Sequence, residues 1–259
     1  MDHGHPATDR PSINATETSL AVVEALHEDD GATISELAET LGVAKSTVYS
    51  HLCTLEDSGY VVKEGTTYHV GFKFLHHGEY VRARKPACRI AAESLADLAE
   101  RTNEETDFTV ANRGRVIRVV QDQVQHGQNA PSDRMTGSYD YMHNTASGKA
   151  ILARYSWDRV EAVLDEWGLP ATTAATITDR DTLFETLEDI RQRGYAINDE
   201  ESIEGLRCVS TAVTNAAGDI VGAFSVSGPT YRLRGETLDS EIPSILLDFA
   251  SGFEASLTS

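Results

Sequence analysis

The stretch TISELAETLGVAKSTVYSHLCTLEDSGY, residues 33–60, contains the pattern of two helices joined by a four-residue turn. Thr33 and Glu36 have the spacing of a capping box, and the apolar residues that follow recur at helical intervals until Gly42. A second helix, over about 44–58, carries one apolar face. That face consists of Val48, Leu52 and Leu55. The stretch therefore predicts a helix-turn-helix.

The flanking segments extend this unit in both directions. From Thr16 onward, apolar residues at positions 20, 23 and 26 predict a preceding helix that stops at Asp29-Asp30-Gly31. After Gly59, residues 60–62 and 67–70 have the composition of two strands around a Glu64-Gly65 turn. Three helices followed by a hairpin are the order of a winged helix-turn-helix, which we expect over residues 16–72.

The distribution of acidic residues indicates which face of this unit meets a partner. Thr40–Leu55 contains no acid in 16 residues, and Gly65–Gly78 contains none in 14. Phosphates repel carboxylates, so an acidic protein must keep acids away from a DNA-docking face. The hydroxyls, the phenol and the ammonium opposite the apolar face suit contacts with phosphates and base edges. We therefore expect DNA contacts from Lys45, Ser46, Thr47, Tyr49 and Ser50, and from Thr66 and Thr67 in the hairpin. The alternative is an ordinary solvated helix of a three-helix core.

The rest of the chain predicts a tail, a linker and a second domain. Residues 1–15 are polar and without period, as in a disordered tail. Residues 73–87 predict a helical linker broken by Pro86. Residues 88–259 mix helices with antiparallel hairpins, which favours an α+β sensor-like domain. In that domain the sequence predicts helices over 88–101, 147–154, 158–167, 180–193 and 236–256, strands over 107–112, 116–120, 208–213 and 220–226, and a polar loop over 124–144.

The charge of the chain is strongly acidic. Its 259 residues contain 22 Lys and Arg against 41 Asp and Glu, for a net charge of -19, and only 5 of the cations are Lys. Residues 1–80 hold 4 cations and 13 acids. An excess of carboxylates with few lysines is typical of proteins that work in molar salt, where charge repulsion is screened over about 3 Å. We therefore expect a halophilic origin.

Other features exclude several classes of protein. No run of about 18 apolar residues is present, so no transmembrane helix is expected, and residues 1–14 lack the apolar core of a secretory signal. The cysteines are Cys53, Cys88 and Cys208, an odd number without a CxxC motif, which argues against a disulfide framework or a zinc site. We expect a soluble, cytoplasmic protein without a metal or cofactor.

Several stretches of the chain together resemble the IclR family of transcriptional regulators over about residues 16–257. In the first domain they are 19–26, 33–42, 45–49 and 55–60, and in the second they are 146–150, 177–179, 190–195, 199–201, 205–208 and 225–229. The resemblance implies a winged helix, a helical linker and a GAF-like effector-binding domain. It also implies dimers or tetramers that bind palindromic DNA operators and respond to small molecules, often carboxylates or aromatic acids.

Three positions depart from the family pattern. Ser50 stands where a basic residue is usual, Ala212 where proline is usual, and Asn198 where the prototype has a carboxylate. Ser50 therefore lacks the positive charge that would contact a DNA phosphate. The third departure prevents the identity of the effector from being carried over.

The strand around Ser225 predicts one wall of an effector site. Ser225 and Ser227 lie two residues apart and so face the same side of the strand. Inward-facing hydroxyls need polar partners, which a bound ligand would supply. By resemblance, the effector site is lined by Met142, Ala146, Ser147, Asn198, Cys208, Ser225 and Ser227. The alternative is a self-satisfied core with surface loops, in which Met142 packs and Cys208 is a small buried apolar residue.

Other motifs in the second domain give weaker indications of function. Asp199-Glu200-Glu201 reads as a solvated acidic turn, and Ser147-Gly148-Lys149 is not a phosphate-binding loop, because position 150 is Ala and position 143 is His. An enzyme is disfavoured, since no GxSxG or GxGxxG motif is present. A redox sensor based on Cys208 and a purely architectural DNA-binding protein stay open as alternatives. We therefore expect an effector-controlled, sequence-specific DNA-binding regulator that acts as a homodimer or homotetramer.

Overall fold

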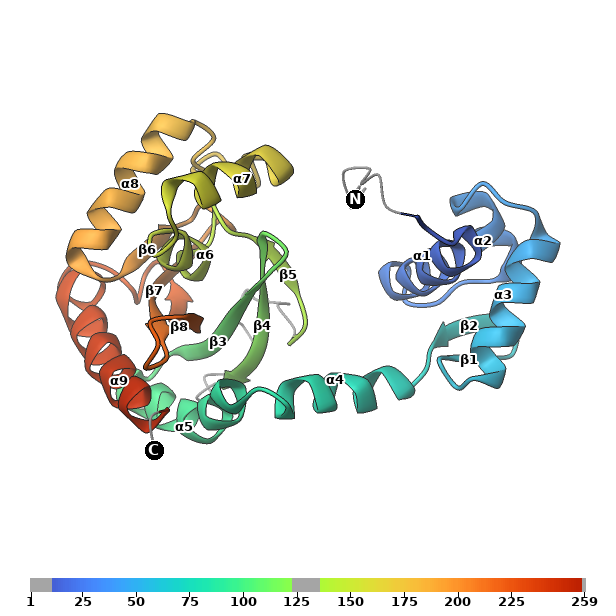
Figure 1. Ribbon diagram of the computed structural model, residues 1–259, viewed down its shortest axis with the longest axis horizontal. Helices are drawn as coiled ribbons and strands as arrows, with labels where there is room; N and C mark the ends of the chain where they lie inside the picture. Colours follow the sequence, from blue (N-terminus) through green and yellow to red (C-terminus); the bar gives the residue numbers. More distant parts are fainter. Residues whose placement is uncertain (1–10, 123–135, 258–259) are drawn as a thin grey trace. The chain divides into compact units, whose positions relative to one another are not determined.

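The computed structural model describes residues 11–122 and 136–257 (Figure 1). The chain divides between Arg82 and Ala83 into two compact units. The first contains three helices and a two-stranded wing, followed by a fourth helix that runs to the boundary. Its elements are α1 (Asn14–Glu28), α2 (Ile34–Thr40), α3 (Lys45–Asp57), β1 (Val61–Glu64), β2 (Thr67–Val70) and α4 (Lys73–Ala83).

The core of this first unit forms where the apolar faces of the helices meet the hairpin. Its fully buried members include Val22, Leu26, Leu37, Val48, Leu52 and Tyr68. Tyr68 also ties the wing to the helices, because its backbone exchanges hydrogen bonds of 2.9 and 3.0 Å with Ala32. The winged helix-turn-helix predicted from the sequence is confirmed.

The capping box at the start of α2 has both of its hydrogen bonds. The Thr33 hydroxyl accepts from the Glu36 amide at 3.4 Å, and the Glu36 carboxylate accepts from the Thr33 amide at 2.7 Å. Both amides would otherwise lack a partner, because the first turn of a helix has no preceding carbonyls. The box fixes where α2 begins and hence the turn that leads to α3.

Two boundaries differ from the sequence-based expectation. The tail expected over residues 1–15 is too long, because α1 begins at Asn14; its residues 1–10 lie outside the described part of the chain. The Thr18 hydroxyl donates to the Asn14 carbonyl at 2.9 Å and closes this first turn. The linker expected over 73–87 ends earlier, because α5 begins at Pro86 and buries Ala87 in the core of the second unit.

The second unit is one antiparallel six-stranded sheet with helices on both faces. The strand order is β5-β4-β3-β8-β7-β6. The strands are β3 (Glu105–Asn112), β4 (Arg115–Asp122), β5 (Tyr139–Tyr141), β6 (Ala196–Asp199), β7 (Leu206–Thr214) and β8 (Ile220–Pro229). The helices are α5 (Pro86–Thr102), α6 (Ala146–Leu152), α7 (Trp157–Trp167), α8 (Arg180–Arg193) and α9 (Ile242–Ser256). The α+β class predicted for this domain is confirmed.

Alternation along the strands assigns the two faces of the sheet. Phe108, Phe224 and Val226 point to one face, where they pack with α5 and α9. The helices α6, α7 and α8 cover the other face and form a second apolar cluster (Figure 1). Polar residues at the alternate positions of the strands thus face α6 and not α9.

Three elements differ from the sequence-based predictions. The described end of the loop expected over 124–144 contains β5, whereas residues 123–135 lie outside the described part. The strand β6 is a further element, too short and polar to show an alternating apolar pattern. The helix expected from residue 236 begins with a π-helical turn, Thr237–Glu241, before α9. Among the described residues, no helix is long and apolar enough to cross a membrane.

Candidate functional site

The helix α3 presents the polar residues that the sequence singled out. Val48 and Leu52 are fully buried, whereas the five residues on the remaining faces are exposed. Those five are Lys45, Ser46, Thr47, Tyr49 and Ser50. Tyr49 is the largest of them and is 54% exposed. The helix therefore offers one continuous polar surface to a partner.

Hydrogen bonds hold two of these side chains in place. The Lys45 ammonium donates to the Ser35 hydroxyl at 2.8 Å, which holds the cation against the first turn of α2. The Ser50 hydroxyl donates to the Ser46 carbonyl at 3.0 Å and retains its acceptor capacity. A hydrogen-bonding contact with Cys53 raises the pKa of Tyr49, so the phenol stays protonated and can donate.

The wing carries the other two predicted residues. Thr66 is exposed in the turn between β1 and β2, and Thr67 is the first residue of β2, opposite Glu64. Thr67 is half-buried. Of the two, Thr66 is therefore the more accessible to a nucleic acid.

In the second unit, the sheet register brings polar residues from five strands onto the face that α6 covers. Cys208 of β7 pairs with Asn198 on one side and with Ser227 on the other. In the neighbouring row, Ser225 of β8 pairs with Asp107 of β3. Arg118 of β4 lies opposite Thr109, two residues further along β3. Residues far apart in the sequence thus share one surface.

This surface and the start of α6 enclose a small polar cavity. Its volume is about 10 Å³, roughly the space of a single water molecule. Six predicted effector residues line it, namely Ala146, Ser147, Asn198, Cys208, Ser225 and Ser227, together with Asp107, Thr109, Arg118, Asp140 and Thr145, which the sequence reasoning missed. We call this space the ligand cavity.

Met142, the seventh residue predicted for the effector site, does not line this cavity. Its side chain is 2% exposed and packs in the apolar cluster under α6 and α7. The adjacent Tyr141 makes a cation-π contact. Its ring faces the Arg115 guanidinium, whose central carbon lies 4.0 Å from the ring centroid.

Arg118 is the main positive charge of the ligand cavity. Its guanidinium nitrogens lie 3.6 Å from the Asp107 carboxylate and 4.0 Å from that of Glu105. Burial opposes the charge of Arg118, but Asp107, Glu105 and Asp140 outweigh that effect and raise the pKa of Arg118. Arg118 is therefore charged, and three acids surround it.

The start of α6 is held by Thr145. The Thr145 hydroxyl accepts from the Gly148 amide at 3.1 Å and donates to the Tyr141 carbonyl at 2.9 Å. The helix begins at Ala146, one residue before the predicted start, because Thr145 is its N-cap. A threonine before a helical run was the sequence signal for this cap. Ala146 and Ser147 consequently meet the cavity from within the first turn of the helix.

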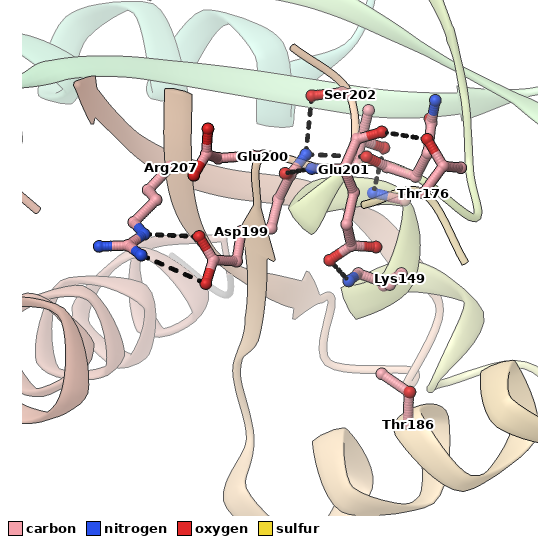
Figure 2. Close-up of polar contacts among 12 residues, drawn as sticks. Lys149, Thr176, Thr186, Asp199, Glu200, Glu201, Ser202 and Arg207 are labelled. Carbon is pink, nitrogen blue, oxygen red and sulfur yellow. Dashed lines mark hydrogen bonds and ion pairs between the residues drawn. The ribbon is translucent and has the colours of Figure 1, made fainter. Parts of the chain in front are cut away.

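Behind the ligand cavity lies a buried ion pair. The Lys149 ammonium donates to the Glu201 carboxylate, as Figure 2 shows. Lys149 is 1% exposed and Glu201 is 7% exposed. Burial raises the pKa of the Glu201 carboxyl and lowers the pKa of Lys149, while each charge stabilises the other. The pair joins α6 to the loop between β6 and β7.

A hydrogen-bond network extends from this pair to Asn198. The Asn198 side-chain oxygen accepts from the Glu201 amide at 2.9 Å, and its NH2 group donates to the Asn144 carbonyl at 2.8 Å and to the Ser202 hydroxyl at 2.7 Å. The Thr176 hydroxyl donates to the Glu201 carbonyl at 2.6 Å (Figure 2). Asn198 thus lines the cavity with an amide that the protein already uses.

The interpretation of Asp199-Glu200-Glu201 as a solvated acidic turn was wrong for Glu201, which is buried against Lys149. The interpretation holds for Asp199, whose exposed carboxylate pairs with Arg207 at 2.6 Å (Figure 2). The Glu200 carboxylate accepts from the Gly205 amide at 2.7 Å. Neighbouring acids differ because only the third points toward α6.

The cysteines and the titratable groups show no further site. None of the three cysteines, all in the described parts of the chain, forms a disulfide bond; Cys88 and Cys208 are buried and Cys53 is half-buried. In the described parts of the chain, no three His, Cys, Asp or Glu side chains gather as a metal-binding group would require. A winged helix-turn-helix followed by a domain with a small polar cavity is the arrangement of ligand-responsive DNA-binding regulators.

The comparison with known families identifies the family. Residues 15–65 match the IclR helix-turn-helix domain, and residues 82–253 match the bacterial transcriptional regulator IclR C-terminal domain. The chain belongs to the IclR family of transcriptional regulators. It is therefore a regulator and not an enzyme, and the fold and family predicted from the sequence are confirmed.

Individual relatives are similar either along nearly the whole chain or over its second domain. The probable HTH-type transcriptional regulator ArcR of Halobacterium salinarum is 29% identical over 258 residues, which cover 99% of this chain and 97% of that protein. The crystal structure of the Thermotoga maritima IclR covers 95% of this chain and 98% of its own, with 27% identity and a TM-score of 0.75. A 3-hydroxybenzoic acid complex of the inducer-binding domain of a PobR double mutant from Acinetobacter covers 64% of this chain and 96% of its own, with 25% identity and a TM-score of 0.60.

Proposed function

We propose that this chain is a sequence-specific transcriptional regulator whose binding to a DNA operator is controlled by a small carboxylic acid bound in the ligand cavity. The observation that carries the proposal is the small polar cavity in the domain that follows the winged helix. Side chains from six strands and from the start of α6 converge there, as in a ligand site with few, well-placed polar groups.

DNA recognition is assigned to α3 and the wing. In this proposal, α3 enters a major groove, where Ser46, Thr47, Tyr49 and Ser50 contact bases or phosphates and Lys45 contacts the backbone. Thr66 of the wing meets the adjacent phosphates. The exposure of these residues and the scarcity of acids around them support the assignment. Since DNA is the partner, the cytoplasm is the proposed site of action.

A carboxylate is the proposed common feature of the effector, with organic acids and sugar acids as the classes to test. The Arg118 guanidinium can bind a carboxylate through two hydrogen bonds. The hydroxyls of Thr109, Ser225 and Ser227 line the same cavity and can donate to its oxygens. The similar inducer-binding domain of the Acinetobacter PobR variant holds 3-hydroxybenzoic acid, which supports an acid as ligand.

Assembly through α4 is also part of the proposal. No residue of α4 is buried, and several apolar side chains in and next to this helix are strongly exposed. They are Phe72 (90%), Leu75 (61%), Tyr80 (64%) and Val81 (55%). An exposed apolar surface of this kind marks an interaction site. We infer that α4 pairs with α4 of a second copy to form a dimer, and that tetramers arise by pairing of effector domains.

A halophilic source fits the composition and the relative from Halobacterium salinarum. The experiment that tests the proposed function is therefore run in molar KCl. A thermal-shift screen of organic and sugar acids should reveal ligands, because a ligand that binds only the native state raises the melting temperature. Operator fragments selected from random DNA should then bind differently with and without each ligand. The proposal fails if the selection enriches no sequence, or if bound ligands leave operator affinity unchanged.

A further inference from the structure

Neutral groups hold the lysines of the DNA-binding unit in place. The ammonium groups of Lys45 and Lys73 donate to a serine hydroxyl and to a serine backbone carbonyl, each at 2.8 Å. The Lys63 ammonium instead lies 5.2 Å from the centroid of the Tyr68 ring, within the range of a cation-π contact. An ammonium has three N–H donors, so a contact with one ring face leaves Lys63 able to donate to an anion.

Lys63 lies where the wing meets the recognition helix α3. It alternates with Val61 along β1, so both side chains point to the same side of the strand. Val61 is 3% exposed and packs in the core that α3 shares with the wing. Across the hairpin, Lys63 pairs with Tyr68 of the same core, whereas the neighbouring Glu64 points to the opposite side of the strand. The Lys63 ammonium therefore lies at the edge of this core.

Tyr49 of α3 reaches the same edge of the core. Its side chain is 54% exposed. Contact with Cys53 raises the pKa of the Tyr49 phenol and Tyr68 adds to this rise, whereas the positive charge of Lys63 acts in the opposite direction. Lys63 is thus close enough for its charge to act on the phenol. Because the pKa is raised on balance, the phenol keeps its proton and can donate a hydrogen bond.

We propose that Lys63 and Tyr49 together bind one phosphate of the DNA backbone, between the wing and the recognition helix. The inference rests on the proposed function and adds a site to it: Lys63 is a new DNA contact, and of the two roles open to Tyr49 the site selects the backbone. A phosphodiester offers two unbridged oxygens and one negative charge. The ammonium of Lys63 and the phenol of Tyr49 can each donate to one of them.

The charge of the unit explains why this position matters. Residues 1–80 hold 13 acids and only 4 Lys or Arg, and carboxylates repel phosphates. Residues 40–55, which include most of α3, contain no acid, but Ser50 on the outer face of the helix carries no charge. Lys45 is held against the first turn of α2. Lys63 therefore supplies, from the wing, a cation to the outer face of α3.

The test maps the phosphate with the full-length protein and its selected operator in molar KCl. Each phosphate of one half-site is replaced in turn by an uncharged methylphosphonate, and the affinity of the native chain and of each variant is measured. For the native chain, we expect a position at which this replacement weakens binding by about tenfold, as for the loss of one hydrogen bond to a charged group. At that position Lys63→Met should lose nothing further, and Tyr49→Phe, which lacks only the hydroxyl, should lose less than the native chain.

Matched variants separate a phosphate contact from a role in folding. Lys63→Arg keeps the positive charge and should keep the native response at the same position. Lys85→Met removes an exposed lysine at the start of α5 and should leave the whole pattern of responses unchanged. Lys45→Met should abolish the response at a different phosphate. The melting temperature shows whether each variant is folded, and the rescue by Lys63→Arg shows that the charge is what binds.

The outcomes separate this inference from the proposed function. If the native chain binds its operator and Lys63→Met responds like it at every phosphate, the site is wrong and the proposed function stands. If only Lys63→Met alters the response, or if Tyr49→Phe changes which base pairs the selection enriches, the backbone role of Tyr49 is wrong. If the native chain selects no DNA sequence and binds no DNA, both the site and the proposed function are overturned.

Discussion

Lys149 and Glu201 form a buried ion pair that fastens α6 to the loop between β6 and β7, directly behind the ligand cavity. One Glu201 carboxylate oxygen accepts from Lys149, and the other, Oε2, is buried and finds no hydrogen-bond partner among the described residues. A buried charge with one partner depends on that partner, because removing it leaves an uncompensated charge in a medium of low dielectric. The pair therefore makes the geometry of the ligand cavity sensitive to a single side chain.

Replacing Lys149 alone should be costly. We expect Lys149→Met to lower the free energy of unfolding by about 3–5 kcal/mol, and the double variant Lys149→Met/Glu201→Leu to lose much less, because it buries no charge. Denaturant unfolding of Lys149→Met, Glu201→Leu and the double variant in molar KCl measures the coupling energy between the two side chains. Losses that simply add would show that the two side chains do not act as a pair.

The Lys149→Met variant should also acquire a pH dependence. Burial already raises the pKa of Glu201, and loss of the neighbouring cation raises it further. A carboxyl with a raised pKa in the folded state contributes stability below its unfolded pKa, and this contribution is lost as pH rises through the folded value. As the pH falls from about 8 to about 5, the difference in unfolding free energy between the variant and the native chain should therefore become smaller. A constant difference across that range would contradict the assignment.

Gly148 should not tolerate a side chain. A Cβ atom at this position would lie 2.3 Å from the Met142 carbonyl oxygen and 2.6 Å from the Thr145 hydroxyl, so Gly148→Ala must displace the backbone that positions Ala146 and Ser147. We expect a loss of about 1–3 kcal/mol in unfolding free energy and weaker binding of any effector. Gly252→Ala in α9 is the matched control, because nothing lies near its Cβ position; it should stabilise by up to about 1 kcal/mol. Equal melting temperatures for the two variants would refute this packing argument.

The sequence could predict most of the helices and four of the six strands of the second domain, but not the partners across the sheet. Periodicity located α3. The Thr145 cap of α6 was not predicted, although a threonine before a helical run is a signal for such a cap. Arg118 and Asp107, however, lie on separate strands of a mixed apolar and polar pattern, and only the sheet register brings them together. Glu201 looked like a solvated acid for the same reason: its partner is 52 residues away in the sequence.

Operator recognition by α3 predicts a specific loss on substitution. Tyr49→Ala and Ser50→Ala should each weaken operator binding by about 1–3 kcal/mol if these side chains read bases. Ser251→Ala is the control, because the Ser251 hydroxyl donates to a helix carbonyl at 3.0 Å just as that of Ser50 does, but in α9. Quantitative footprinting in molar KCl provides the measurement. Unchanged footprints for both α3 variants would reject the assignment.

Dimerisation through α4 predicts a change in mass. Leu75→Asn and Val81→Asn should each weaken the dimer by about 1.5–3 kcal/mol, the free energy of burying one large apolar side chain. Tyr231→Ser is the control, since Tyr231 is 66% exposed but belongs to the effector domain. Sedimentation equilibrium gives the dissociation constants. A native chain that sediments only as a 28.2 kDa monomer, or variants that dimerise like it, would contradict pairing through α4.

The acidic charge of the DNA-binding half predicts an unusual response to salt. Residues 1–80 hold 13 acids and only 4 Lys or Arg, so at low ionic strength this half should repel DNA. Ordinary basic proteins lose affinity as salt rises, because binding releases counterions from DNA. Here the repulsion is screened over about 3 Å at 1 M salt, and cations can be taken up between carboxylates and phosphates. Operator affinity should therefore be nearly constant, or should rise, with increasing KCl.

The same measurement tests coupling between the two domains. Operator affinity is followed across about 0.5–3 M KCl, a range over which the screening length is already short, with and without a bound effector. If a ligand in the cavity controls operator binding by the dimer, the effector should shift operator affinity by about 1–3 kcal/mol at each salt concentration. Operator DNA should shift effector affinity by the same amount, because the coupling is reciprocal. A steep fall of affinity with salt would defeat the charge argument. An effector that binds without any shift would show that the cavity does not control DNA binding.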